Sequence, residues 1–251
     1  MIPVGADSHT YEASPREIVR LARSDAFVYM GAHAERFIDE GGWLAAVDEA
    51  KTPTLRYAEH MELIFVHRII DHGDHTHDYS GGDPHVWLDP ARVHEMADLT
   101  AAFLARIDPG GKATYEANAR RYREQLVTLE RELDEGIARI PPERRKLVVF
   151  HDAYTYFAKR YGFEIVDYVI KSSGAEPSAA EIADMHRTIR QHRVPAVFKE
   201  PQFNAAILDR VAAETGVKVG TLLTDNFTPE VTTYLNLMRF NLKSLVTLLG
   251  S

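Results

Sequence analysis

Short apolar runs alternate along the chain with longer stretches in which apolar residues recur every three or four positions. In the first half, the apolar runs predict strands at residues 26–31 (AFVYMG), 54–58 (TLRYA) and 63–70 (LIFVHRII). The helical period predicts helices at 15–24, 37–50 and, after the Asp89-Pro90 start signal, 91–107. This alternation of strands and helices is typical of α/β proteins.

A single long amphipathic helix divides the sequence into two halves. It is predicted for residues 112–140, and its apolar stripe consists of Tyr115, Ala119, Tyr122, Leu126, Leu129 and Leu133. After it, strands are predicted at 146–150, 164–170, 196–200 and 218–223, and a helix follows each of them. We therefore expect an α/β fold with an N-terminal lobe at 1–111, a linker helix at 112–140 and a C-terminal lobe at 141–251.

Composition narrows the classes of function. The net charge of −8 and the absence of a basic stripe argue against a nucleic-acid partner. No apolar run reaches the roughly 18 residues needed to span a bilayer, and the first residues have no signal-peptide pattern. Because cysteine is absent, a metal site would have to be built from histidine and carboxylate.

Histidines are concentrated in one short region. Six of the chain's 12 histidines fall within 28 residues: His67, His72, His75, His77, His85 and His94. Short histidine-rich tracts are usually metal-binding, whereas an isolated His-x-His pair is more often part of a solvated polar loop. The density here, together with the surrounding DPHVWLDP, favours a metal site.

Four potential ligands share the same kind of position. His9 follows the strand-like IPVGAD, His85 lies in DPHVWLDP, His151 follows the strand KLVVF, and Asp225 follows KVGTLL. Ligands of open parallel sheets bind beyond the carboxyl ends of the strands. Three histidines and one aspartate would suit tetrahedral Zn²⁺, although each histidine alone could equally be structural.

Other polar residues fit structural roles better. His94-Glu95 reads HExxD rather than the HExxH of zinc proteases, and on its amphipathic helix a surface role is expected for it. Glu200 could be a cleft carboxylate, but a structural contact at a strand end fits better. Ser178 or Glu176 is expected to cap a helix. His33 and Glu35 could line a cleft and are not expected to be ligands.

Several motifs together resemble a known family. GADSHTYEASPREI, DPHVWLDP, VVFHDAYTYFAKRYG, GAEPSAAEI, VFKEPQFN and YLNLMRFNLKSL occur in the order found in the metal-specific solute-binding proteins of zinc and manganese ABC importers. The resemblance covers nearly the whole chain. It implies two (β/α)4-like lobes joined by a long helix, with the metal between them. It also implies a periplasmic or extracytoplasmic location and a membrane permease as partner.

The resemblance also implies which residues bind metal. Its ligand positions match His9, His85, His151 and Asp225, and its zinc-type members carry a histidine-rich loop, here His72, His75 and His77. Members that bind manganese resemble this chain but have a carboxylate in place of His151. Because imidazole suits Zn²⁺ and oxygen ligands suit Mn²⁺, we expect Zn²⁺ rather than Mn²⁺.

The sequence departs from the family pattern in two places. A strand and a helix normally precede GADSHTYE, so we expect the first lobe to lack its first β/α unit. Such a lobe would either self-associate or cover the exposed sheet edge with its own loops. In addition, Lys199 stands where a small residue is usual, and the sequence offers no reason for it.

Two other classes of protein compete with a transport protein. A zinc hydrolase would keep an open position for water, with Glu200 or Asp225 as general base. An adhesin or zinc-buffering surface protein could use the same scaffold. A fourth ligand at Asp225 would close the site to water, so we expect a binding protein rather than an enzyme.

Overall fold

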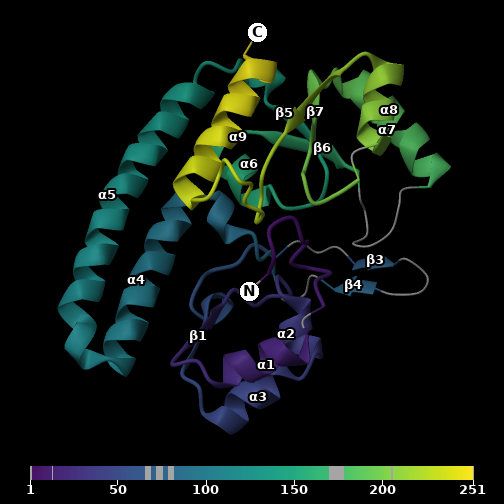
Figure 1. The fold of residues 1–251 in the computed structure, drawn as a ribbon. Helices are drawn as coiled ribbons and strands as arrows, with labels where there is room; N and C mark the ends of the chain where they lie inside the picture. The colour runs from purple at the N-terminus through teal and green to yellow at the C-terminus, as the bar shows by residue number, and fades with distance from the viewer. Residues whose placement is uncertain are drawn as a thin grey trace. The chain divides into compact units, whose positions relative to one another are not determined.

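The computed structural model describes residues 2–12, 14–65, 69–71, 76–78, 82–169, 178–204 and 206–250. This part of the chain divides into two compact units. The first unit comprises Met1–Ile69 and Asp78–Val127, and the second comprises Ile70–His77 and Thr128–Ser251. The predicted α/β fold is confirmed by the alternation of parallel strands and helices (Figure 1).

The first unit contains a small parallel sheet in which β1 (Phe27–Tyr29) pairs with β2 (Thr54–Arg56). Its core also includes residues from α1 (Pro15–Ala22), α2 (Arg36–Glu40) and α3 (Trp43–Ala50). The buried cluster consists of Leu21, Phe27, Tyr29, Ile38, Trp43 and Val47. Burial of Phe27 and Tyr29 fixes β1, and the carboxyl end of β1 leads into a loop that belongs to the candidate site.

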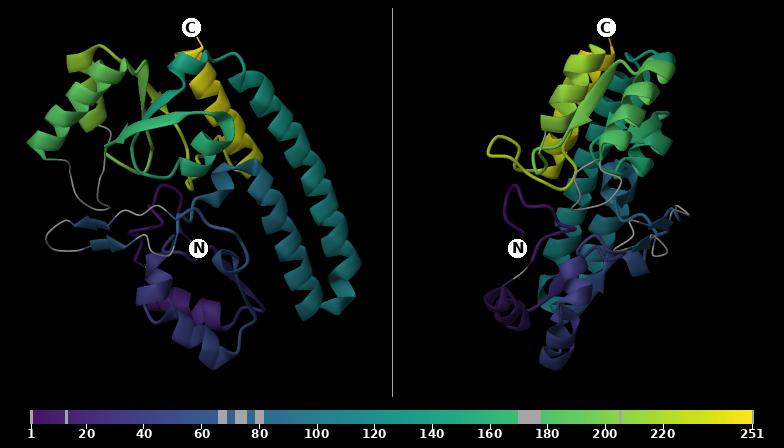
Figure 2. Two further views of the ribbon diagram at one scale, coloured as in Figure 1. Left: turned by 180° about the vertical axis from the view of Figure 1, so that it is seen from behind. Right: turned by 90° about the vertical axis from the view of Figure 1, so that its right-hand side faces the viewer.

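Two long helices complete the first unit. The helix α4 (Pro90–Ile107) begins as predicted, because the Asp89 carboxylate accepts a hydrogen bond from Ala91 N at 3.1 Å. The turn η4 (Pro109–Gly111) leads into α5 (Lys112–Ile137), which lies beside α4 and continues into the second unit (Figure 2). With 26 residues, α5 is about 39 Å long. The predicted long helix is therefore confirmed, and it ends at Ile137 rather than at residue 140.

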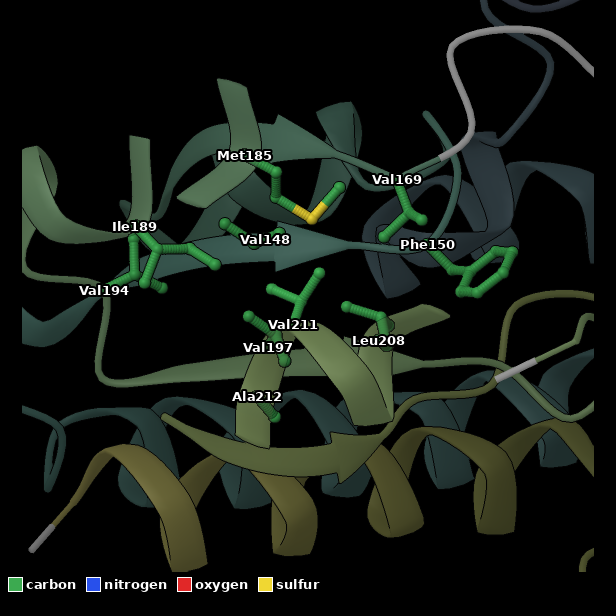
Figure 3. Close-up of a cluster of buried hydrophobic side chains, with 10 residues drawn as sticks. All are labelled: Val148, Phe150, Val169, Met185, Ile189, Val194, Val197, Leu208, Val211 and Ala212. Atoms are coloured by element: carbon green, nitrogen blue, oxygen red, sulfur yellow. The ribbon is translucent and has the colours of Figure 1, made fainter. Parts of the chain in front are cut away.

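The second unit is built on a four-stranded parallel sheet with the order β6-β5-β7-β8. Its strands are β5 (Lys146–Val149), β6 (Glu164–Tyr168), β7 (Ala196–Lys199) and β8 (Lys218–Thr221). Its helices are α6 (Thr155–Tyr161), α7 (Ala179–His192), α8 (Ala206–Thr215) and α9 (Tyr234–Leu249). Side chains of α7 and α8 pack on one face of the sheet against β5 and β7 (Figure 3). Because helices cover this parallel sheet, its two central strands, β5 and β7, are mostly buried apolar runs, which the sequence pattern detected.

The last helix is tied to the chain that follows β8. Asn241 of α9 is 2% exposed. Its side-chain amide accepts a hydrogen bond from Leu223 N at 2.8 Å and donates one to Leu223 O at 2.7 Å. The α9 helix is also tied to α5, where the Arg239 guanidinium donates to the Glu132 carboxylate at 2.6 Å. The segment leading to Asp225 therefore has a fixed support within the second unit.

The single helix predicted at 37–50 is wrong, because two short helices, α2 and α3, occupy that range. The break falls at Gly41-Gly42, where Gly42 has φ +73°. A left-handed residue cannot continue a right-handed helix, and glycine adopts this conformation without steric cost.

Two strand predictions are also corrected. IPVGAD forms a turn, in which Ala6 N donates to Pro3 O at 3.1 Å, rather than a strand. Residues 63–65 are not in a strand either, and Ile64 O accepts a single backbone hydrogen bond, from Asp83 N at 2.8 Å. Residues 66–68 lie outside the described part of the chain. The strand β3 (Ile69–Asp71) forms a separate two-stranded sheet with β4 (Thr76–Asp78).

No helix within the described ranges has both the length and the apolar composition needed to cross a bilayer.

Candidate metal centre

His9 is positioned by its backbone and by one ring nitrogen. Its backbone N–H donates to Asp7 Oδ1 at 3.0 Å, which closes a tight turn. Its Nδ1 lies 3.2 Å from the carbonyl oxygen of His33. A carbonyl oxygen can only accept, so Nδ1 of His9 carries the proton, and the neutral ring has its lone pair on Nε2.

The loop that supplies this carbonyl has an unusual backbone. Gly31, Ala32 and His33 all have positive φ, at +75°, +51° and +64°. The Glu35 carboxylate accepts the backbone N–H groups of Met30 and Gly31, each at 3.0 Å, and so stabilises the bend. Strained backbone of this kind persists only where surrounding contacts hold it. His33 thus contributes the carbonyl oxygen that orients the His9 ring, a role that no sequence pattern indicates.

His85 is held by a buried carboxylate. Its Nδ1 lies 2.8 Å from Asp83 Oδ1, and the same oxygen accepts the backbone N–H of His85 at 2.9 Å. His85 is 3% exposed and Asp83 is 4% exposed. An ionised carboxylate only accepts, so the neutral His85 ring also carries its proton on Nδ1 and its lone pair on Nε2.

The two lone pairs of the first unit face each other. His9 Nε2 lies 3.2 Å from His85 Nε2. Two acceptors at this distance repel unless a cation, either a proton or a metal ion, lies between them. Two nitrogen ligands of a tetrahedral Zn²⁺ with bonds of about 2.0–2.1 Å are about 3.3–3.4 Å apart. The pair therefore has the spacing and the tautomers that a shared zinc ion requires.

His151 is the corresponding residue of the second unit. It follows β5, and its Nδ1 lies 2.7 Å from Glu200 Oε1. Glu200 is 1% exposed at the end of β7. The structural contact predicted for Glu200 is thus a hydrogen bond to His151, and it leaves Nε2 of the neutral His151 ring able to bind a metal.

Asp225, the predicted carboxylate ligand, belongs to the same network. Its Oδ1 is within hydrogen-bonding distance of Thr224 Oγ1 (2.9 Å), Asn226 Nδ2 (3.2 Å) and Gln202 Nε2 (3.4 Å). Thr224 and Gln202 also reach Glu200 Oε2, at 2.7 and 3.1 Å. The second unit thus brings His151 and Asp225 into one set of hydrogen bonds.

Tyr154 adds a buried hydroxyl near these carboxylates. Burial, followed by the negative charges of Glu200 and Asp225, raises the pKa of Tyr154 well above its ordinary value. The hydroxyl therefore stays protonated, and toward the two carboxylates, which only accept, it would be a hydrogen-bond donor. Within the described residues it has no hydrogen-bond partner.

The remaining sequence predictions have mixed outcomes. Ser178 caps α7 as predicted, with its hydroxyl accepting from Glu181 N at 3.3 Å, whereas Glu176 lies outside the described residues. His72 and His75 lie outside them as well, and His77 belongs to β4. Lys199 donates to Asp209 of α8 at 3.4 Å, which gives this unexpected lysine a surface partner.

Comparisons with known proteins agree on one family. The family model described as "Zinc-uptake complex component A periplasmic" matches residues 1–248. The zinc-binding lipoprotein AdcA of Streptococcus pneumoniae is 30% identical over 254 residues, which cover 98% of this chain and 50% of AdcA. The chain thus spans about half the length of that relative.

Two further relatives extend this picture. The manganese-binding lipoprotein MntA of Halalkalibacterium halodurans is 28% identical over 98% of this chain and 79% of its own length. The crystal structure of a ZnuA matches with a TM-score of 0.80 and 27% identity, over 99% of this chain and 89% of that one.

Proposed function

The chain belongs to the family of the periplasmic zinc-uptake component A, and from this membership we propose that it binds Zn²⁺ outside the cytoplasm and delivers it to the permease of an ABC importer. The metal is the transported substrate of this protein and not a resident cofactor. The family resemblance and the chemistry of both half-sites support this proposal.

Four residues are the proposed ligands of one zinc ion: His9, His85, His151 and Asp225. The three histidines each have Nδ1 bound to an oxygen acceptor, which leaves Nε2 of the neutral ring for the metal. The proposal draws two ligands from each unit. A set of three imidazoles and one carboxylate fits tetrahedral zinc and leaves no open position for a catalytic water.

The observation that carries the proposal is the pair of Nε2 atoms of His9 and His85, 3.2 Å apart. A structural role for either histidine would not require both lone pairs to point at each other. A cation between them removes the repulsion, and zinc satisfies both nitrogens at once.

The choice of zinc over manganese depends on His151. Imidazole suits Zn²⁺, whereas Mn²⁺ favours oxygen ligands, and a third histidine therefore shifts the set toward zinc. Neither the zinc-hydrolase alternative nor self-association finds support in the relatives, and we propose neither of them.

The histidine-rich loop is proposed to be a secondary zinc-capturing segment. It comprises His72, His75 and His77, none of which belongs to the four proposed ligands, and we expect these histidines to be interchangeable. Deleting residues 72–80 should remove weak additional zinc equivalents and leave one tight equivalent in a competitive titration. Loss of the tight equivalent would place the loop in the primary site and contradict this proposal.

The central experiment is metal analysis of protein purified without added metal, followed by competitive titration with Zn²⁺ and Mn²⁺. The parent should bind one tight equivalent of zinc and prefer it to manganese. Removing a residue that only supports a ligand weakens metal binding by up to about 100-fold. Loss of a ligand should weaken zinc binding by more than this in each of the variants His9→Ala, His85→Ala and His151→Ala.

The matched control is His192→Ala. His192 is an exposed histidine of the second unit that lies 3.7 Å from Glu164, and its loss should leave zinc affinity unchanged. Unaltered zinc affinity in His151→Ala, or preference of the parent for Mn²⁺, would refute the proposed site.

A further inference from the structure

Glu200 occupies a special position in the second sheet. The strand β7, which it follows, lies between β5 and β8 in the strand order. His151 follows β5 and Asp225 follows β8. A residue at the carboxyl end of β7 can therefore contact side chains that follow both neighbouring strands, and Glu200 contacts His151 directly and Thr224 beside Asp225.

Both oxygens of Glu200 are engaged, although the residue is almost fully buried. Oε2 lies 2.7 Å from Thr224 Oγ1 and 3.1 Å from Gln202 Nε2. These two donors hold the carboxylate in place, and Oε1 is directed at His151 Nδ1. Burying an ionised carboxylate is unfavourable unless hydrogen bonds compensate it, so a carboxylate at this position needs a reason beyond packing.

We propose that Glu200 is a positioning residue for the metal: it keeps the proton of His151 on Nδ1, fixes the ring and so presents Nε2 to zinc. This inference rests on the proposed function. The carboxylate also increases the electron density of the imidazole, which makes His151 a stronger ligand than a histidine bound to a neutral acceptor. Glu200 itself does not touch the ion.

A second glutamate–histidine pair in the same unit offers a matched comparison. Glu214 Oε2 of α8 lies 3.4 Å from His186 Nε2 of α7, and the Glu214 side chain is exposed whereas that of His186 is partly buried. Glu214→Gln removes a carboxylate from a histidine just as Glu200→Gln does. It differs in that His186 is not a proposed ligand.

The first measurement is a double-mutant cycle on zinc affinity in the full chain. Glu200→Gln should weaken zinc binding about 10- to 100-fold, the range found when a partner of a metal-binding histidine is removed. Most of that loss should disappear in the His151→Ala background, because Glu200 acts through His151. Glu214→Gln should change nothing. An equal loss in both backgrounds, or no loss in Glu200→Gln, would overturn the inference.

The second measurement is independent of zinc. Side-chain ¹⁵N shifts of His151, measured by NMR on the metal-free parent near neutral pH, should report the tautomer with the proton on Nδ1. In Glu200→Gln this preference should be reduced, because an amide can also direct its NH₂ group at the ring. A parent with the proton on Nε2 would overturn the inference even if Glu200→Gln failed to fold.

The two proposals fail in different ways. If His151→Ala bound zinc as tightly as the parent, the proposed ligand set would be refuted, while the tautomer measurement would still decide the role of Glu200 toward His151. If His151→Ala lost zinc binding and Glu200→Gln did not, only the positioning role would be refuted.

Discussion

The three proposed histidine ligands are held through the same ring atom but by acceptors of different charge. His9 binds a neutral backbone carbonyl, whereas His85 and His151 bind the carboxylates of Asp83 and Glu200. A carboxylate makes the imidazole a better electron donor than a carbonyl does. The zinc affinity of the protein should therefore depend more strongly on the acceptors of His85 and His151 than on the acceptor of His9.

Asp83 and Asp7 allow this dependence to be tested in one unit. Each accepts the backbone N–H of the site histidine two residues later, but only Asp83 also binds the ring. Asp83→Asn should lower zinc affinity at least about 10-fold, because the ring of His85 loses its charged acceptor. Asp7→Asn should have a much smaller effect. Competitive titration would measure both, and equal losses would mean that Asp83 acts only through the backbone turn.

The sequence indicated the proposed ligands more readily than the groups that support them. His85 could be selected from the DPHVWLDP motif, and His151 because it follows the strand β5. The His33 carbonyl could not, since every residue carries one and its direction depends on the positive φ of the loop. Glu200 was recognised only as a strand-end contact, because its partner His151 lies 49 residues earlier in the chain.

At the scale of elements, the predicted helices and strands were recovered where burial and capping agreed. The two central strands of the second unit, β5 and β7, are buried apolar runs, and α4 and α7 begin directly after Asp89 and Ser178, as these capping residues indicate. The errors occurred where local backbone chemistry prevailed over apolar pattern. The IPVGAD stretch has strand-like side chains but contains Pro3 and Gly5, and it closes into a turn.

The glycine pair between α2 and α3 gives an element-scale prediction. Gly42 has φ +73°, and a Cβ placed on it would have no atom within 4 Å. Gly42→Ala should therefore lower the free energy of unfolding by about 1–2 kcal/mol through backbone strain alone. Gly42→Asn should cost less, because asparagine tolerates the left-handed region. Urea unfolding of the metal-free protein would measure both, and a neutral Gly42→Ala would show that the break can relax.

The ion pair between α5 and α9 predicts a dependence of stability on pH. The hydrogen bond from Arg239 lowers the pKa of Glu132. A carboxyl whose pKa is lower in the folded state stabilises the fold above its unfolded pKa, and this contribution is lost as pH falls through the folded pKa. Arg239→Gln should thus destabilise the protein at neutral pH by less than about 1 kcal/mol, since both side chains are more than one-third exposed.

The measurement is urea unfolding of the parent and Arg239→Gln between neutral and acidic pH. Their difference should shrink as pH falls below the ordinary carboxyl range, near about 4. A difference that stays constant across this range would mean that Arg239 stabilises α9 by packing rather than by charge.

At the scale of the whole molecule, the proposed ligands come from both units, so zinc should stabilise both. Zinc at about 100 times its dissociation constant should add about 2.7 kcal/mol to the free energy of unfolding, and a chelator should remove it. Calorimetry of the parent should show that zinc raises the unfolding temperatures of both units. In the double variant His9→Ala/His85→Ala, zinc should no longer raise the unfolding temperature of the first unit. A zinc effect confined to one unit in the parent would contradict a shared ion.

The paired hydrogen bonds between Asn241 and Leu223 have a consequence for amide exchange. The side chain of Asn241 satisfies Leu223 as a neighbouring strand would, although Leu223 lies beyond the end of β8. The amide hydrogen of Leu223 should therefore exchange with deuterium as slowly as those of the sheet, since it opens only when α9 separates from β8. Asp225, two residues later, thus follows a segment that is released only when α9 separates from β8.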